Sequence, residues 1–113
     1  MKTILDKLEF DSIILNHENV ICFVHSPWSF TSVVGLQRFS EMSKLNLDFT
    51  FVIIDNESGE SFVYDWLKVN GVNIDSIPSK HKNWINGNGE LFEIRKGILV
   101  RFEQKIFDNK HNL

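Results

Sequence analysis

Two serines and a threonine lie close together in the run Trp28, Ser29, Phe30, Thr31 and Ser32, which follows an apolar segment ending at His25. The residues after this run have helical periodicity, so free backbone N–H groups and the helix dipole could hold an anion or a thiolate here. The same residues also fit a structural role, with Ser29 capping the helix and Trp28 packing against the core. The sequence leaves both roles open.

His25 is the nearest candidate base, four residues before Ser29, so a Ser-His nucleophilic pair can be drawn. A hydrolase also needs an acidic residue to orient the histidine and an oxyanion hole, and the sequence identifies neither. His17, His81 and His111 are scattered and have no metal-ligand spacing. We therefore expect no catalytic serine, no metal site and no cofactor.

Cys22 is the only cysteine, so one chain can form no intramolecular disulfide, no CxxC redox pair and no cysteine-rich zinc site. It lies inside the apolar run Val20–Val24. A lone cysteine in such a run behaves as a small buried hydrophobic residue. We expect its thiol to be inert.

The composition predicts one folded domain, residues 1–113, because 113 residues with 42% hydrophobic content can bury a continuous core. Fifteen acidic and twelve basic residues leave a net charge of -3, and no basic run favours nucleic acid. The apolar stretches are shorter than the ~20 residues that span a bilayer, so we expect no membrane partner. The N-terminus lacks the apolar centre of a secretory signal, which predicts a cytoplasmic chain if the native protein begins here.

Alternating helical and strand patterns must position these residues. Strand, helix and strand in succession favour a parallel βαβ crossover. The segments that we expect, in chain order, are a helix through Leu5–Leu15, a strand Val20–His25, a helix from Ser29 or Thr31 to about Lys44, a strand Phe49–Ile54, a helix Glu60–Val69, a hairpin joining Trp84–Ile85 to Leu91–Ile94 through Asn86–Gly89, and a last helix Leu99–Phe107.

This order resembles the thioredoxin family over nearly the whole chain. The run Trp28–Ser32 takes the place of Trp-Cys-Gly-Pro-Cys, directly after a strand and directly before the long helix. Ile77-Pro78-Ser79 resembles the segment that carries the family's cis-proline, and Asn88-Gly89-Glu90 is similar to its Asn-Gly-Glu hairpin. The resemblance implies a three-layer α/β/α sandwich with a central mixed sheet of four to five strands and about four helices.

The departures from the family pattern concern its chemistry. Ser29 and Ser32 stand where the family has its two cysteines, and a serine hydroxyl cannot form a disulfide. The family's buried aspartate falls at Phe23. Both losses imply a redox-inactive domain rather than an oxidoreductase, unless the two serines are engineered substitutions of native cysteines.

The resemblance implies a binding site made of the run Trp28–Ser32 together with Ile77 and Pro78. Its expected partner is a protein or peptide; the alternative is glutathione or another thiol ligand held by Ser29, as in a transferase. The alignment between Pro78 and Gly89 has two solutions. Either a short strand follows an inserted loop, or His81 takes the cis-proline position; Pro78 is preferred because cis geometry elsewhere costs about 3 kcal/mol. A cis Ile77-Pro78 bond would leave a groove in which an extended peptide could pair.

Overall fold

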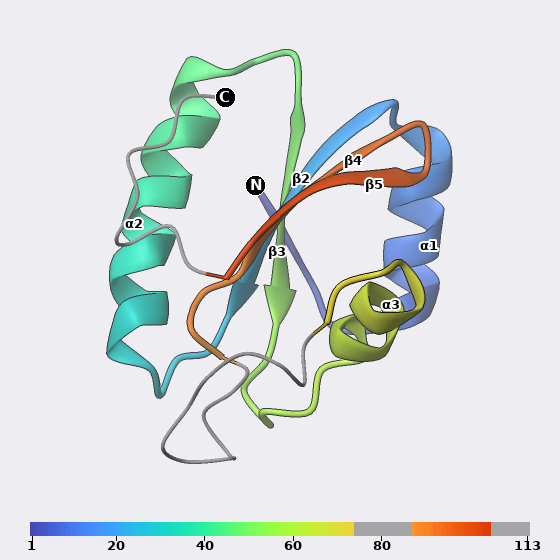
Figure 1. The fold of residues 1–113 in the computed structure, drawn as a ribbon. Coiled ribbons are helices and arrows are strands. Elements are labelled where there is room, and N and C mark those ends of the chain that lie inside the picture. Colours follow the sequence, from blue (N-terminus) through green and yellow to red (C-terminus); the bar gives the residue numbers. More distant parts are fainter. Residues whose placement is uncertain (74–86, 105–113) are drawn as a thin grey trace.

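A computed structural model describes residues 1–73 and 87–104 of the chain. A mixed five-stranded sheet has the strand order β1-β3-β2-β4-β5. Helix α2 covers one face of the sheet, while α1 and α3 cover the other (Figure 1). The elements are β1 (Lys2–Ile4), α1 (Lys7–Asn16), β2 (Asn19–His25), α2 (Phe30–Leu45), β3 (Thr50–Asp55), α3 (Val63–Val69), β4 (Leu91–Arg95) and β5 (Ile98–Glu103). The predicted three-layer α/β/α class is confirmed; the described residues contain three helices.

Strand β2 lies at the centre of the sheet. It pairs in parallel with β3, where His25 lies opposite Asp55, and antiparallel with β4. Residues Val20–Val24 are fully buried, because both faces of this strand are covered by helices. The parallel β2-α2-β3 crossover expected from the sequence is therefore present (Figure 1).

Two aromatic-rich clusters hold the layers together, one on each face of the sheet. Phe10 of α1 contacts Trp66 of α3 with ring centroids 5.1 Å apart, on one face. Phe39 of α2 stacks on Phe23 of β2 at 5.3 Å, on the other. Phe23, which the sequence resemblance aligns with the family's buried aspartate, is fully buried in this second cluster.

The C-terminal part of the described chain differs from the sequence-based prediction. The hairpin joins β4 to β5 through the two-residue turn Lys96-Gly97, not through Asn86–Gly89. Asn88-Gly89-Glu90 therefore precedes β4 instead of forming the hairpin turn. The predicted helix Leu99–Phe107 is wrong over residues 99–103, which belong to β5. The helical periodicity of this segment is misleading. A β-bulge in the β4–β5 pairing lets Leu99 and Phe102, which are three residues apart, pack against the same hydrophobic cluster.

Strand β1 was not predicted; its three residues pair with β3, and this tertiary contact forms it. The expected site residues Ile77 and Pro78, the proposed cis bond and the predicted strand at Trp84 lie outside the described residues. Within residues 1–73 and 87–104, the structure has no helix with the length and apolar character needed to cross a membrane.

Candidate functional site

The junction between β2 and α2 brings the predicted run Trp28–Ser32 together. Ser29 is the N-cap of α2, and its Oγ accepts a hydrogen bond from the Ser32 backbone N–H at 3.4 Å. The Thr31 hydroxyl lies 3.0 Å from the same oxygen. Ser29 therefore has the capping role that the sequence allowed, with its hydroxyl half-buried at the helix start.

Ser32 lies deeper than Ser29, and its side chain is fully buried. Its Oγ accepts a hydrogen bond from the Ser26 N–H at 2.7 Å and lies 3.0 Å from Nδ1 of His25. His25, which the sequence allowed as a partner of Ser29, therefore pairs with Ser32 instead. Because the Ser32 hydroxyl is shielded from solvent, this contact joins the strand end to the helix and presents no nucleophile.

His25 is half-buried at the end of β2. Desolvation lowers the pKa of its imidazole, and the nearby Asp55 carboxylate opposes this shift. Asp55 Oδ2 itself accepts a hydrogen bond from the Glu57 N–H at 3.4 Å. The net lowering favours a neutral imidazole near pH 7, which suits a structural hydrogen bond with the buried hydroxyl.

Trp28 is 48% exposed and lies beside the helix start. Its indole N–H donates to the Glu57 carbonyl oxygen at 3.0 Å, and its ring covers Gly59 and Gly87. A Cβ atom at Gly87 would lie 2.4 Å from the ring, so only glycine allows this contact. Phe30 is 72% exposed and Val33 is 41% exposed on the first turns of α2. We call Trp28, Phe30 and Val33 the Trp28 patch.

The segment Gly87–Glu90 lies against the start of α2. A Cβ atom at Gly89, whose φ is +85°, would lie 3.0 Å from the Cα atom of Ser32 and 3.0 Å from the Phe23 ring. Within the described residues, this segment therefore adjoins the Trp28–Ser32 run. It leads directly into β4, whose pairing with β2 holds it there.

A buried polar network lies beneath this segment, and the sequence reasoning missed it. Glu90 accepts hydrogen bonds from the Tyr64 hydroxyl at 3.0 Å and from the Gly87 N–H at 2.8 Å. Asn56 donates to Tyr64 at 3.2 Å and to the Ser26 hydroxyl at 2.8 Å. These side chains come from four separate segments, so no local spacing could have revealed the network.

Burial dominates the protonation of this network. Desolvation raises the pKa of Glu90, and hydrogen bonds from backbone N–H groups and from Tyr64 oppose the rise. Burial also raises the pKa of Tyr64, with the Glu90 charge as the next cause, so the phenol keeps its proton. The network can hold the Gly87–Glu90 segment in place. Glu90 itself is fully buried, so its side chain is not accessible from the protein surface.

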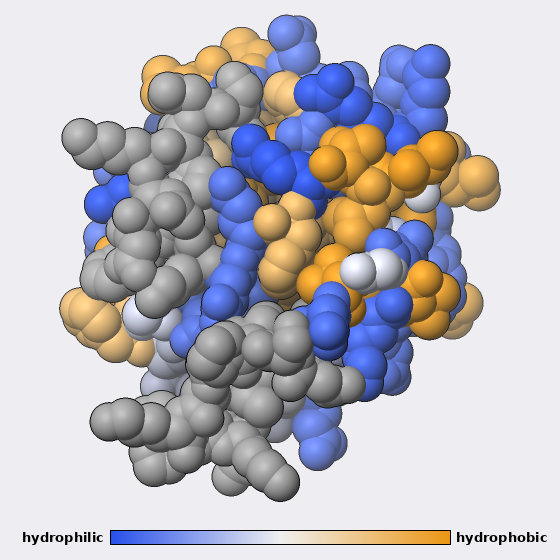
Figure 2. Space-filling view, viewed as in Figure 1, coloured by the Kyte–Doolittle hydropathy of each residue, from blue (hydrophilic) through white to orange (hydrophobic). Residues whose placement is uncertain are grey.

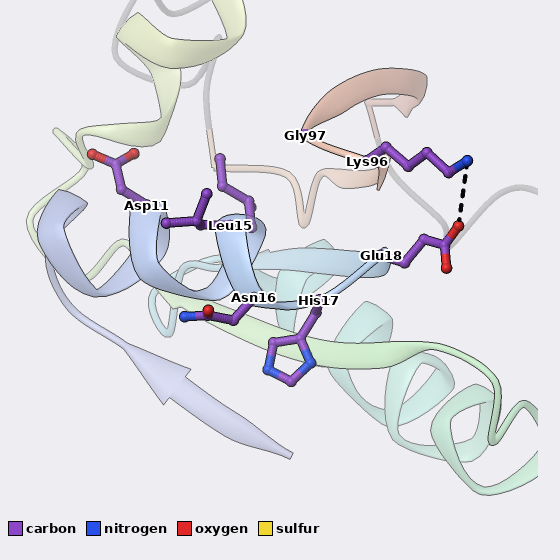
Figure 3. A pocket seen from close by; sticks show the side chains of 8 residues that line it. Asp11, Leu15, Asn16, His17, Glu18, Lys96 and Gly97 are labelled. Atoms are coloured by element: carbon purple, nitrogen blue, oxygen red, sulfur yellow. Dashed lines mark ion pairs between the residues drawn. The ribbon is translucent and has the colours of Figure 1, made fainter.

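A cavity of about 630 Å³ lies at the opposite end of the sheet, between the C-terminal end of α1 and the β4–β5 turn (Figure 3). Ile14 and Leu15 supply its apolar wall, and the ion pair between Lys96 and Glu18, at 3.6 Å, borders it. None of the predicted site residues lines this cavity. The cavity and the Trp28 patch are therefore separate features.

No protein-family model and no curated protein matches the sequence. Solved structures do match. A Plasmodium falciparum thioredoxin is 20% identical, with a TM-score of 0.66 over 93% of this chain and 86% of the other. Oxidised mitochondrial thioredoxin 3 from Saccharomyces cerevisiae is 14% identical, with a TM-score of 0.63 over 91% of this chain and 81% of the other. Fasciola hepatica thioredoxin is 9% identical, with a TM-score of 0.66 over 93% and 86%. The chain therefore has the thioredoxin fold.

Proposed function

We propose that this chain is a redox-inactive domain of the thioredoxin fold that binds a protein or peptide at the Trp28 patch. The observation that carries the proposal is the serine pair at the β2–α2 junction. Ser29 caps the helix and Ser32 is buried against Ser26 and His25. By the sequence resemblance, these two positions correspond to the cysteines of a thioredoxin.

The remaining thiol supports the absence of redox chemistry. Cys22 is fully buried in β2, and burial raises the pKa of its thiol well above the ordinary range. The thiolate is the reactive form in disulfide exchange, so a buried thiol with a raised pKa is a poor nucleophile. A single thiol also cannot close an intramolecular disulfide after attack.

The binding role is supported by what surrounds the serines. Trp28 and Phe30 expose 48% and 72% of their surface at the helix start. Large aromatic side chains that remain exposed are the residues that most often anchor protein interfaces. The indole of Trp28 packs against Gly59 and Gly87, so its position is already fixed before a partner binds.

Insulin reduction tests the redox part of the proposal. We expect no activity above background from the wild-type chain with dithiothreitol as the electron source. The matched variant Ser29→Cys/Ser32→Cys restores a dithiol on the same backbone, and we expect it to form a disulfide when oxidised. Catalysis by the wild-type chain at the rate of an ordinary thioredoxin would contradict the proposal.

Selection from a displayed peptide library tests the binding part. Peptides selected on the wild-type chain should lose at least about tenfold in affinity to Phe30→Ala, as truncated aromatic anchors do. Leu45→Ala, at an 82% exposed position at the other end of α2, is the control and should bind unchanged. Equal binding to both variants would place the interface elsewhere.

Glutathione is the competing ligand. Of the two serines, Ser32 is fully buried, so a thiol ligand could reach Ser29 alone. Calorimetric titration with glutathione distinguishes the two ideas. Heat of binding that disappears in Ser29→Ala would favour the thiol-ligand function, whereas no heat up to millimolar concentrations would leave the peptide-binding proposal. Sequencing the native gene tests whether the two serines are original.

A further inference from the structure

The loop between β3 and α3 lies directly beside the Trp28 patch. The Trp28 indole N–H donates to the Glu57 carbonyl oxygen at 3.0 Å, and a Cβ atom at Gly59 would lie 3.7 Å from the same ring. Glu57 and Glu60, which flank Gly59 in this loop, are exposed. Two exposed acidic residues therefore border the patch.

The described segments around the patch contribute no cation that balances these carboxylates. Residues 45–67 contain no lysine or arginine, and residues 30–37 at the start of α2 carry no charged side chain. Desolvation lowers the pKa of His25 against the effect of Asp55, which favours a neutral imidazole near pH 7. The N-terminus of α2 adds only about half of a positive charge, which two carboxylates exceed. These surroundings are therefore negatively charged.

Hydrogen bonds hold the acidic loop in one conformation. The Asn56 N–H donates to the His25 carbonyl oxygen at 2.9 Å, and the Gly59 N–H donates to the Asn56 carbonyl oxygen at 3.1 Å. The side chain of Asn56, which is buried, accepts a hydrogen bond from the Ser61 N–H at 3.0 Å. The loop that carries both carboxylates is therefore pre-organised beside the indole, so a partner need not order it on binding.

A second apolar area gathers on the side of α1, α3 and the β4–β5 turn (Figure 2). The ion pair Lys7–Asp11 lies on α1, and the ion pair Lys96–Glu18 borders the cavity there. Because these charges balance, that area favours neither sign of charge in a partner. The Trp28 patch differs, since the exposed charges of the described loop beside it have one sign.

We infer that the Trp28 patch binds a basic peptide in which an arginine lies next to an apolar side chain. The apolar side chain packs against Phe30 and Val33. The guanidinium stacks on the exposed part of the indole and pairs with Glu57 or Glu60. Arginine fits better than lysine, because its planar group both stacks on an aromatic ring and binds a carboxylate with two N–H groups. This inference rests on the proposed binding function and names its partner.

Selection from a displayed library of random peptides on the full wild-type chain tests the inference. The selected peptides should be enriched in arginine next to an apolar residue. Replacing that arginine with citrulline keeps the shape of the side chain and removes its charge. We expect this change to weaken binding at least about threefold, the effect of an exposed ion pair. Added salt should weaken the arginine peptide more than the citrulline peptide.

Charge-neutralising variants show which carboxylates the arginine meets. In Glu57→Gln/Glu60→Gln, the arginine and citrulline peptides should bind equally, because the partners of the charge are gone. Glu18→Gln/Glu41→Gln is the matched control, since it removes the same net charge from exposed positions after α1 and in the second half of α2. We expect this control to keep the wild-type preference for the arginine peptide.

Failure of the inference differs from failure of the binding function. Peptides that lose affinity in Phe30→Ala but tolerate citrulline would overturn the inference and leave the binding function intact. Phe30-dependent peptides enriched in aspartate or glutamate would do the same, as would a citrulline effect that persists in Glu57→Gln/Glu60→Gln. If no peptide bound in a way that depends on Phe30, the binding function itself would fail, and the inference with it.

Discussion

Ser29 and Ser32 have the same side chain three residues apart, yet they contribute differently. Ser29 satisfies a backbone N–H at the exposed start of α2. Ser32 is fully buried, and its oxygen satisfies the Ser26 N–H at 2.7 Å, a donor that no other described group reaches. The difference follows from geometry, because the second serine has turned with the helix toward β2.

Substitution at Ser32 should therefore be costly. Ser32→Ala leaves the buried Ser26 N–H without its acceptor, which lowers the free energy of unfolding by about 1–3 kcal/mol. Ser58→Ala is the control, since the Ser58 hydroxyl accepts a backbone bond from Glu60 on the exposed surface. We expect that variant to change stability by less than about 0.5 kcal/mol. Urea unfolding measures both, and equal losses would contradict the distinct role of Ser32.

The segment Gly87–Glu90 joins three elements that are far apart in the chain. Glu90 connects it to Tyr64 of α3, and the Glu90 carbonyl pairs with Val24 of β2. Gly87 and Gly89 allow the close approach to Trp28 and Ser32. A change in the charge of Glu90 should therefore affect the packing of the whole Gly87–Glu90 segment.

The pH dependence of stability should report on Glu90. Its pKa is raised from the ordinary value of 4.5 by burial, so the folded chain holds this proton more tightly than the unfolded chain. Its contribution to stability is therefore fully present below pH 4.5 and is lost as the pH rises from there through the raised pKa. Glu90→Gln removes this loss.

Urea unfolding of both proteins between pH 4 and 8 measures the effect. The free-energy difference between the wild-type chain and Glu90→Gln should shift against the wild type as the pH rises, because only the wild type must bury a charge. Glu57→Gln, at an exposed position, is the control and should show no such trend. A difference that is constant with pH would show that the hydrogen bonds to Glu90 fully offset its burial.

Across the whole molecule, Cys22 lies in the central strand with helices on both faces. Its thiol should react with 5,5′-dithiobis(2-nitrobenzoic acid) only when the fold opens. In Ser29→Cys, the added half-buried thiol serves as an internal control. We expect Cys22 to react at least about 10³-fold more slowly than that thiol, as the stability of an ordinary domain implies. Similar rates for both thiols would show that β2 opens locally.

The sequence alone determined the central β2-α2-β3 unit of this protein. The predicted strand Val20–His25 and the predicted helix from Ser29 or Thr31 to about Lys44 agree with β2 and α2 to within one or two residues. Continuous apolar runs, helical periodicity and a serine cap are local signals, so they survive without tertiary context. The burial of Cys22 followed from the same local pattern.

Only the tertiary structure decided how the remaining parts meet. The short strand β1 depends on its pairing with β3, and Leu99–Glu103 is a strand because β4 lies beside it. Long-range pairing overrides local periodicity in such segments. The choice of Ser32 over Ser29 as the partner of His25, and the network around Glu90, likewise depend on residues distant in sequence. The candidate site is built from contacts between separate segments. The spacing of residues along the chain does not reveal such contacts.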